Sequence, residues 1–417
     1  MRSAGKATVV VVLAALLLGG GLPAEADAKL PRGWPAKMHL GSWDPLGGAK
    51  KLRQRAPFRF RYQYLTGGAN TGAGWRFVSP NGSFVRRYVR ESVRRRMTPV
   101  FSYLQLRPSL PGGNTQDEPA AVRQNFENRA TMRAYFEDLR YFFRRARSTR
   151  RRMVLQVEPD MWGYAQQRAA GKVAAETVPV VVSGTGLREL AGLPNTVAGF
   201  AQGVRRLRDR YGKRVLLGYH LSTWGSGVDI DRTHPPPEPV AAFATTAARF
   251  YRSLRTRFDL VFAEFDNRDA GYRLRVFGDA GAHWNRADFD RHARFLRTFS
   301  RATKRRIVLT RIPVGNTRMR AVNNTFGHYQ DNRVETLLAP PRYRRLRAYR
   351  RAGVIALLFG GGVPGNTCAC DFMRDGVTNP RPINGNRRRS RGRDDDGGYF
   401  RVRARQYYRR GPLGLRR

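Results

Sequence analysis

Carboxylates follow two short apolar segments of this 417-residue chain, at spacings that would let them act together. Gln156, Glu158 and Asp160 alternate with apolar residues, and Glu264 and Asp266 close a second such segment. Residues two apart on an extended strand point to the same face, and a buried carboxylate is costly unless it is paired or used. Two facing carboxylates can divide acid–base work, one giving a proton and the other acting as base or nucleophile. The predicted catalytic residues are therefore Glu158, Asp160, Glu264 and Asp266.

Further polar and aromatic side chains stand at comparable positions and would bind a substrate. Flat, rigid aromatic faces suit the apolar faces of sugar rings, and a guanidinium can hold a neighbouring carboxylate ionised. The predicted substrate-binding residues are Trp43, Asp44, Tyr64, Tyr103, Trp162, His220, Trp224, Arg311 and Asn316. Structural alternatives stay open. Glu158 or Glu264 could serve only as a buried partner of Arg311. His220 could be a satisfied interior histidine, and each Trp could belong to the core.

The elements that must position these residues alternate regularly along the chain. Eight apolar segments are predicted strands, at residues 36–42, 58–65, 98–105, 153–158, 215–223, 260–266, 307–313 and 354–359. Helical periodicity lies between several of them, at 130–147, 197–211, 240–258, 287–303 and 343–351. Such alternation implies a parallel sheet with right-handed crossovers.

Eight strand–helix units are what closing a barrel requires. We therefore predict an α/β fold, a (β/α)8 TIM barrel over residues 29–365, with an open doubly wound sheet as the alternative. No Gly-rich phosphate loop follows the first strand, which disfavours nucleotide binding. Long loops at 66–83 and 360–398 follow the second and eighth strands. They would lie on the face where the strands end, which is where barrel enzymes build their sites.

The first residues have the features of an export signal. Arg2 and Lys6 precede an apolar run over residues 7–18, and Ala26-Asp27-Ala28 offers a small-x-small cleavage site. The run is shorter than the roughly 20 residues that span a bilayer. We predict that residues 1–28 are a signal peptide and that the protein is secreted and extracellular. No membrane association is expected after signal removal; an uncleaved anchor is the alternative.

The net charge is +47, because 78 Lys and Arg face only 31 Asp and Glu. One interpretation is a solvated, arginine-rich surface that reflects codon usage. The other is adhesion to an anionic polymer through this basic surface. No nucleic-acid-binding motif accompanies the charge, so no specific nucleic acid partner is expected.

The C-terminal segment, residues 366–417, is rich in Arg, Asp and Gly and is expected to pack on or near the barrel. It holds the two cysteines, Cys368 and Cys370, whose pairing would close a tight, strained ring, so their redox state stays open. The run Asp394-Asp395-Asp396-Gly397-Gly398 matches no regular calcium loop, and a solvated turn is favoured. No metal and no cofactor is expected.

Two resemblances accompany these patterns. The stretch Val154–Asp160 resembles the "IEPDS" segment of glycoside hydrolase family 6, the inverting cellulases, although Met161 replaces the serine. That resemblance implies a general-acid role for Asp160. The whole mature chain is similar to a group of secreted actinobacterial proteins of uncharacterised function. The segments that carry this similarity are Lys37–Asp44, Leu217–Ser222, Gly315–Thr317, His328–Glu335 and Asp394–Phe400. Similarity to this group implies that the protein is exported and that it folds as a glycoside-hydrolase-like barrel.

These observations predict a secreted glycoside hydrolase-like protein that cleaves a polysaccharide or cell-envelope glycan by carboxylate acid–base catalysis. The alternative is a non-catalytic barrel that binds a glycan or the cell wall. We expect Glu158, Asp160 and Glu264 to converge in one cleft walled by Trp162 and Trp224. A separation of roughly 5–10 Å between the carboxyls suits catalysis. Direct pairing of Arg311 with both carboxyls would favour the alternative.

Overall fold

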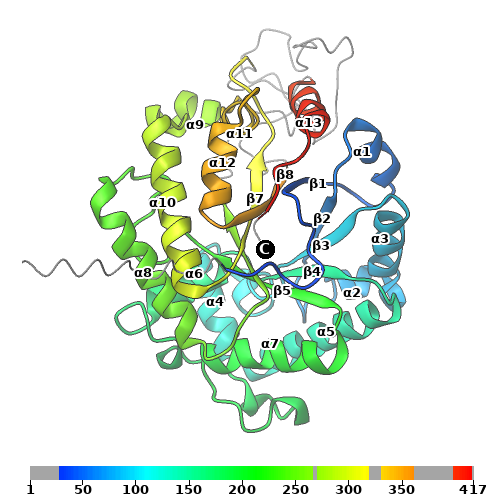
Figure 1. Ribbon diagram of the computed structural model, residues 1–417. Coiled ribbons are helices and arrows are strands. Elements are labelled where there is room, and N and C mark those ends of the chain that lie inside the picture. Colours follow the sequence, from blue (N-terminus) through cyan, green and yellow to red (C-terminus); the bar gives the residue numbers. More distant parts are fainter. Residues whose placement is uncertain (1–27, 266–269, 319–329, 361–397, 416–417) are drawn as a thin grey trace, which may run out of the picture.

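The computed structural model describes residues 28–265, 270–318, 330–360 and 398–415 (Figure 1). The proposed signal peptide, Asp266, both cysteines and the Asp394–Asp396 run lie outside these residues. No helix in the described part is long and apolar enough to cross a bilayer.

Eight parallel strands close into a barrel in sequence order, as predicted, with β1 pairing both β2 and β8. Each strand corresponds to one of the eight predicted segments. The strands are β1 (His39–Trp43), β2 (Phe60–Leu65), β3 (Thr98–Tyr103), β4 (Met153–Val157), β5 (Val215–Leu221), β6 (Leu260–Glu264), β7 (Ile307–Pro313) and β8 (Val354–Gly360). Closure leaves no open sheet edge, so the doubly wound alternative is excluded.

Helices surround the barrel (Figure 1). They are α1 (Ala49–Arg55), α2 (Trp75–Val78), α3 (Ser83–Arg94), α4 (Glu118–Glu127), α5 (Arg129–Ser148), α6 (Met161–Arg168), α7 (Val197–Tyr211), α8 (Pro237–Ser253), α9 (Ala270–Phe277), α10 (Arg286–Thr303), α11 (Arg333–Leu337), α12 (Arg344–Arg351) and α13 (Tyr399–Arg409). Local sequence fixes several of their starts. Asn128 caps α5 by accepting from the Thr131 N–H, and Asn285 forms a capping box with Asp288 at α10.

Aromatic side chains fill the space between the strands and the helices. Trp162 contacts Tyr219, Phe200 and Phe258, with ring centroids between 5.0 and 5.7 Å apart. Strands such as β4 are buried along their whole length because side chains fill the barrel and helices cover it. This packing makes the barrel a rigid support for the residues at its strand ends.

Helix α13 and the described residues after it pack against β8 and against the residues that lead into β1. Phe400 of α13 packs on Phe359 of β8 at 4.5 Å between ring centroids. Met38 N–H donates to Leu413 at 2.8 Å, and the Tyr407 hydroxyl donates to the Met38 carbonyl at 2.7 Å. The described part of the C-terminal segment therefore lies against the end of the barrel where β1 begins.

Candidate active site

Three side chains from successive strands meet where those strands end. Asp160 lies three residues after β4, His220 is near the end of β5, and Glu264 is the last residue of β6. One carboxylate oxygen of each acid and one ring nitrogen of His220 all lie within 4.8 Å of one another. The Asp160 side chain is 30% exposed and that of Glu264 is 12% exposed, so both acids are partly open to solvent. We call Asp160, His220 and Glu264 the carboxylate cluster.

Arg311 supplies the positive charge of this cluster. Its guanidinium donates to Glu264 Oε2 at 3.0 Å and lies 3.8 Å from Asp160 Oδ2. The pairing of β7 with β8 shifts register between Leu309 and Ile312, and Arg311 has φ 55° inside that irregularity. A β-bulge re-aims a side chain that regular alternation would direct elsewhere. The irregularity in β7 therefore turns Arg311 toward the two carboxylates.

The two acids occupy different electrostatic surroundings. Burial, reinforced by the nearby charge of Glu264, raises the pKa of Asp160 to about 6, although Arg311 acts in the opposite direction. Glu264 makes the closer contact with Arg311, and an adjacent cation favours the ionised carboxylate. Asp160 is therefore the better suited of the two to hold and donate a proton, and Glu264 is the better suited to remain ionised.

The cluster also has the ligand types of a metal site, since two carboxylates and an imidazole converge. A divalent cation bound there would lie beside the Arg311 guanidinium, which already neutralises Glu264. Like charges at that distance repel strongly in a partly buried site. The residues present therefore fit a guanidinium better than a metal ion.

A chain of hydrogen bonds orients His220 from inside the barrel. The Ser102 hydroxyl donates to Gln156 Oε1 at 2.5 Å, and Gln156 Nε2 lies 2.7 Å from His220 Nδ1. With the amide oriented in this way, Nδ1 accepts and the ring proton sits on Nε2. Among the described residues, Nε2 has no hydrogen-bond partner, and it lies 3.7 Å from Glu264 Oε1. His220 therefore presents a buried donor to the cluster.

Tyr64 of β2 connects the cluster to a cavity. Burial raises the pKa of Tyr64, and the charges of Arg311, Glu264 and Asp160 all act on its hydroxyl. Tyr64 also lines a cavity of about 540 Å³, whose wall includes Leu46, Gln63, Trp75 and Phe84. Trp43 donates to Gln63 Oε1 at 3.0 Å and so supports this wall. The cavity therefore shares the wall residue Tyr64 with the surroundings of the acids, and its lining is both apolar and polar.

Glu158 does not join the cluster, contrary to the predicted convergence. Strand β4 ends at Val157, and Glu158 has φ 48°, so the alternation does not continue past the strand. Its Oε1 accepts the backbone N–H groups of Gln105 and Leu106 at 3.0 and 3.1 Å. The side chain is fully buried, and burial raises its pKa to about 8. Glu158 thus ties the end of β4 to the end of β3.

Trp162 was expected to wall the cleft, but the structure buries it completely between the barrel and the outer helices. Its indole N–H donates to the Val157 carbonyl at 2.8 Å. Trp162 is the second residue of α6, and its ring packs behind the strand, where it cannot face the cluster.

Tyr103 and Asp44 also point away from the cluster. Tyr103 is fully buried and donates to Asp138 of α5 at 2.6 Å. Asp44 pairs with Arg61 at 2.5 Å, and the Arg61 guanidinium lies 4.0 Å from the ring of Tyr88 on α3. Both side chains fasten strand ends to surrounding helices, and neither is placed to touch a substrate at the cluster.

The remaining predicted residues lie around the cluster or outside the described chain. Trp224 follows β5, is half-buried, and packs against Tyr164 with the rings tilted and their centroids 4.8 Å apart. Asn316 follows β7 and is buried, with Oδ1 accepting the Arg318 N–H at 3.0 Å. Asp266 lies outside the described residues, so its role stays a prediction.

Ser102 and Gln156 are site residues that the sequence did not single out as such. Gln156 does share the alternation of the β4 acids, which is the signal that would have found it. Ser102 pairs with Gln156 across the β3–β4 register. Only that register, not the sequence, places the two side chains together.

No family model and no curated protein sequence matches the chain. Among solved structures, it is similar to a modular endo-β-1,4-mannanase of glycoside hydrolase family 26 from Cellulomonas fimi. The identity is 10%, covering 84% of this chain and 68% of that one, with a TM-score of 0.41. It is also similar to a glycoside hydrolase-like protein at 11% identity, covering 94% of this chain and 97% of that one, with a TM-score of 0.37. At these values neither similarity assigns a family or an activity to the chain.

Proposed function

We propose that this chain is a glycoside hydrolase in which Asp160 is the general acid and Glu264 the nucleophile. The supporting observation is the carboxylate cluster: two partly exposed acids, one just after β4 and one at the end of β6, approach within 4.8 Å, with a cation held against one of them. Retaining glycosidases keep their two carboxyl groups about 5–5.5 Å apart, whereas inverting enzymes leave a wider gap for water. The short separation favours retention of configuration.

The chemistry follows from the different surroundings of the two acids. Protonated Asp160 would donate its proton to the glycosidic oxygen as that bond breaks, and ionised Glu264 would attack the anomeric carbon. Asp160, now ionised, would then take a proton from water, whose oxygen displaces Glu264 from the sugar. His220 Nε2–H, next to Glu264, is placed to donate to a sugar hydroxyl or to the carboxylate oxygen released at that step.

The substrate would be a polysaccharide or cell-envelope glycan, reached after export through the proposed signal peptide. Tyr64 and the adjoining 540 Å³ cavity would accept sugar units on one side of the cleaved bond. Trp224, half-buried after β5 and four residues beyond His220, would bind on the other side.

A second candidate is a barrel that binds a glycan without cleaving it. One observation favours it: Arg311 lies within ion-pair distance of both acids, which would hold both as anions and leave no proton donor. The contact to Asp160 is the longer one, at 3.8 Å against 3.0 Å to Glu264, which is why we place catalysis first.

A hydrolysis screen against plant and bacterial polysaccharides tests the proposal, with Asp160→Asn, Glu264→Gln and the matched control Glu158→Gln. Loss of an acid or base costs about 10²–10⁴-fold in rate. We expect that loss in the first two variants and near wild-type activity in the control. Glu264→Ala with added azide should release a glycosyl azide. Hydrolysis that survives both cluster substitutions, or glycan binding without any hydrolysis, would reject catalysis here.

A further inference from the structure

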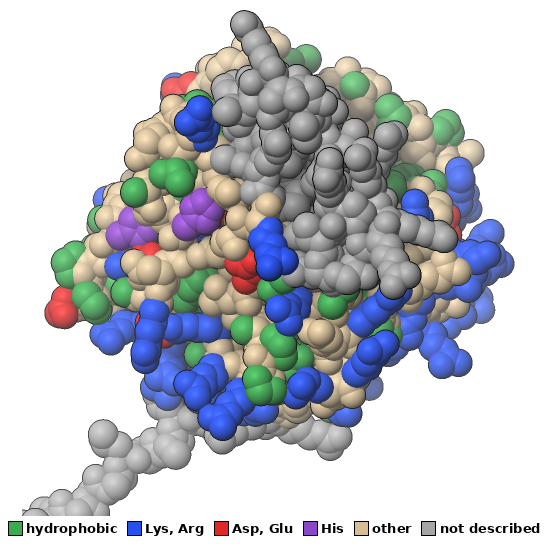
Figure 2. All heavy atoms as spheres, turned by 90° about the horizontal axis from the view of Figure 1, so that it is seen from above, with side chains coloured by type: hydrophobic (Ala, Val, Ile, Leu, Met, Phe, Trp, Pro, Cys, Tyr) green, Lys and Arg blue, Asp and Glu red, His purple; other side chains and the backbone are tan. Residues whose placement is uncertain are grey.

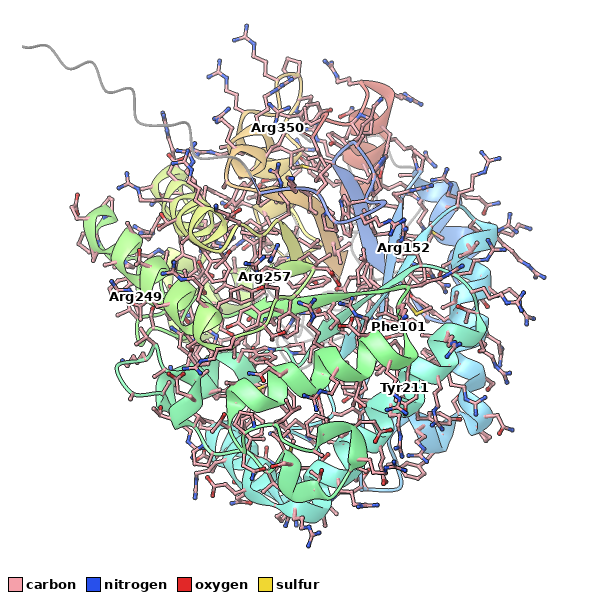
Figure 3. The ribbon with its side chains drawn as sticks, turned by 60° about the horizontal axis from the view of Figure 1, so that its bottom comes forward. Phe101, Arg152, Tyr211, Arg249, Arg257 and Arg350 are labelled. Carbon is pink, nitrogen blue, oxygen red and sulfur yellow. The ribbon has the colours of Figure 1, made fainter. Side chains whose placement is uncertain are left out.

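The face of the barrel opposite the carboxylate cluster carries a ring of positive charge. An exposed cation precedes each of the first four strands within two residues, namely Lys37, Arg59, Arg96 and Arg152. An exposed cation also precedes each of the other four within three residues, namely Arg214, Arg257, Lys304 and Arg351. Figure 3 labels Arg152 and Arg257, which precede β4 and β6, and Arg350, which lies in the last turn of α12 before β8. We call the connections from each helix to the next strand, and the residues before β1, the basic rim.

Negative charge is scarce on this face. Within the described residues of the basic rim, Asp259 is the one acid, and it pairs with Arg208 at 2.6 Å. In the different face shown in Figure 2, Lys and Arg side chains also predominate, but Asp and Glu are interspersed. The described part of the rim therefore carries a large excess of positive charge, with Asp259 as its one counter-charge.

Helix ends explain part of this charge but not all of it. Cations favour the carboxyl ends of helices, and Arg59 and Arg152 donate to the backbone carbonyls of Arg96 and Gly33 at 2.9 and 3.0 Å. A guanidinium has five N–H donors. Each of these bonds uses one of them, so most donors of these exposed side chains remain available to a ligand.

The backbone conformation at four rim positions is stronger evidence than the helix ends that these cations have a function. Arg96, Arg150, Arg255 and Lys304 all have left-handed φ, between 51° and 57°, just after a helix ends. Glycine is strongly preferred there because a Cβ atom is strained. Gly353 occupies the corresponding turn before β8, with φ 94°. The chain contains 43 glycines, yet four of these turns hold a long cation instead.

Two hollows lie within the basic rim. One, of about 470 Å³, is lined by Arg147, Arg150, Arg210, Lys213 and Arg214 at the start of β5. The other, of about 640 Å³, is lined by Lys29, Arg252, Arg255, Arg257 and Lys304 at the starts of β6 and β7. Neither lining includes an acid. Concave cationic sites can each take an anionic group of a flexible chain, and guanidinium forks match phosphate and carboxylate oxygens.

The surroundings of the rim select among anionic partners. Among the described residues, the exposed large apolar side chains are Phe77, Val78, Leu110, Leu274, Val276 and Phe277, and none belongs to the rim. The half-buried ring of Tyr211 lines the smaller hollow, but the Arg144 and Arg210 guanidinium groups lie over it, 4.9 and 5.4 Å from its centroid. A lipid surface would need apolar anchors beside the charge. A single-stranded nucleic acid would need exposed rings for its bases. A linear polymer with phosphate or carboxylate groups and no bases needs neither.

We propose that the basic rim binds a linear, base-free polyanion, an acidic polymer of the cell envelope being the natural class for an exported protein. This site is separate from the proposed catalytic site. All strands are parallel, so the rim lies where they begin and the carboxylate cluster where they end. Binding at the rim leaves the cluster open.

The test replaces the four left-handed cations with glycine: Arg96→Gly, Arg150→Gly, Arg255→Gly and Lys304→Gly together. Glycine relieves backbone strain at these positions, so the variant should fold at least as well as the wild type. The control removes the same charge at exposed helix residues outside the basic rim: Arg86→Gln, Arg123→Gln, Arg129→Gln and Arg286→Gln. Binding to inorganic polyphosphate and to polygalacturonate is measured by fluorescence anisotropy at several salt concentrations.

We expect the glycine variant to bind at least about tenfold more weakly than the wild type and to lose part of the salt dependence, with the control within about twofold. If both variants lost the same affinity, net charge alone would explain the binding, and the proposal would be overturned. Single-stranded DNA bound more tightly than polyphosphate of equal charge, or binding confined to phosphatidylglycerol vesicles, would also overturn it. Hydrolysis by the glycine variant should be unchanged, which separates this test from that of the catalytic site.

Discussion

At the scale of single residues, the site depends on a difference between two carboxyl groups. Asp160 and Glu264 share a cation, yet Arg311 is 0.8 Å closer to Glu264 (3.0 Å against 3.8 Å). Enzymes that use paired carboxyls assign acid and base roles through unequal surroundings of this kind. The same principle explains why Glu158, a stronger candidate by burial alone, has no such role: its charge faces two backbone N–H groups and no cation.

If the proposed mechanism holds, the pH dependence of hydrolysis follows from the pKa of Asp160, which is raised to about 6. The acid must hold its proton to act, so kcat/KM should fall about tenfold per pH unit above pH 6. Substrates with a leaving group that needs no proton should lose this alkaline decline. A profile that stays flat from pH 6 to 8 on a poor leaving group would remove Asp160 from the acid role.

Glu158 should affect stability instead of catalysis. Its pKa is about 8 in the folded chain, against an ordinary value of 4.5. Between these pH values the folded state holds a proton that the unfolded state has lost. The free energy of unfolding should therefore fall with rising pH, by up to about 1.4 kcal/mol per unit from this group. Glu158→Gln imitates the protonated acid and should remove that slope.

Urea unfolding at pH 5 and pH 8 measures the effect. At pH 8 the glutamine variant should be the more stable protein. Glu158→Ala should instead lose about 1–3 kcal/mol at both pH values, because the N–H groups of Gln105 and Leu106 lose their acceptor. Parallel slopes for wild type and Glu158→Gln would show that Glu158 is ionised in the folded chain.

At the scale of elements, the positions of the strands could be predicted from the sequence, but the side-chain directions at the strand ends could not. All eight strand segments follow from apolar runs, because burial on both faces gives a signal that local sequence retains. The direction of a side chain beyond the last paired residue depends on one or two dihedral angles. Glu158 and Arg311 both have left-handed backbones, which no apolar pattern encodes. The convergence of Asp160 with Glu264 was expected from strand order, whereas the inward turn of Arg311 came from a register shift in β7.

Close packing between α6 and the loop after β5 gives an element-scale prediction. A Cβ atom on Gly163 would lie 2.4 Å from the Trp224 ring and 2.8 Å from Ser222 Cβ. Gly163→Ala should push Trp224 outward and cost about 1–3 kcal/mol of stability. It should also raise KM if Trp224 contacts the glycan. Gly414→Ala, which meets nothing within 4 Å, is the matched control, and an unchanged Tm in both variants would contradict the contact.

At the scale of the whole molecule, charge dominates. The Lys and Arg side chains that give the net charge of +47 repel one another, and this repulsion opposes the compact state. The screening length shrinks from about 30 Å at 0.01 M salt to about 8 Å at 0.15 M. Tm should therefore rise with NaCl over that range, as calorimetry can measure. A falling Tm would mean that the surface ion pairs, such as Arg168 with Glu127, outweigh the repulsion.

The parallel order of the barrel strands has a consequence for what the protein could cut. Every strand begins on one face and ends on the other. A molecule held on a polymer by its basic rim would turn its carboxylate cluster away from that polymer. The protein could not cleave the polymer molecule to which its rim is bound. Only a second polymer molecule, on the opposite side of the barrel, would reach Asp160 and Glu264. Anchorage and cleavage would then act on different molecules, so a mesh of two polymers would be degraded faster than either polymer alone.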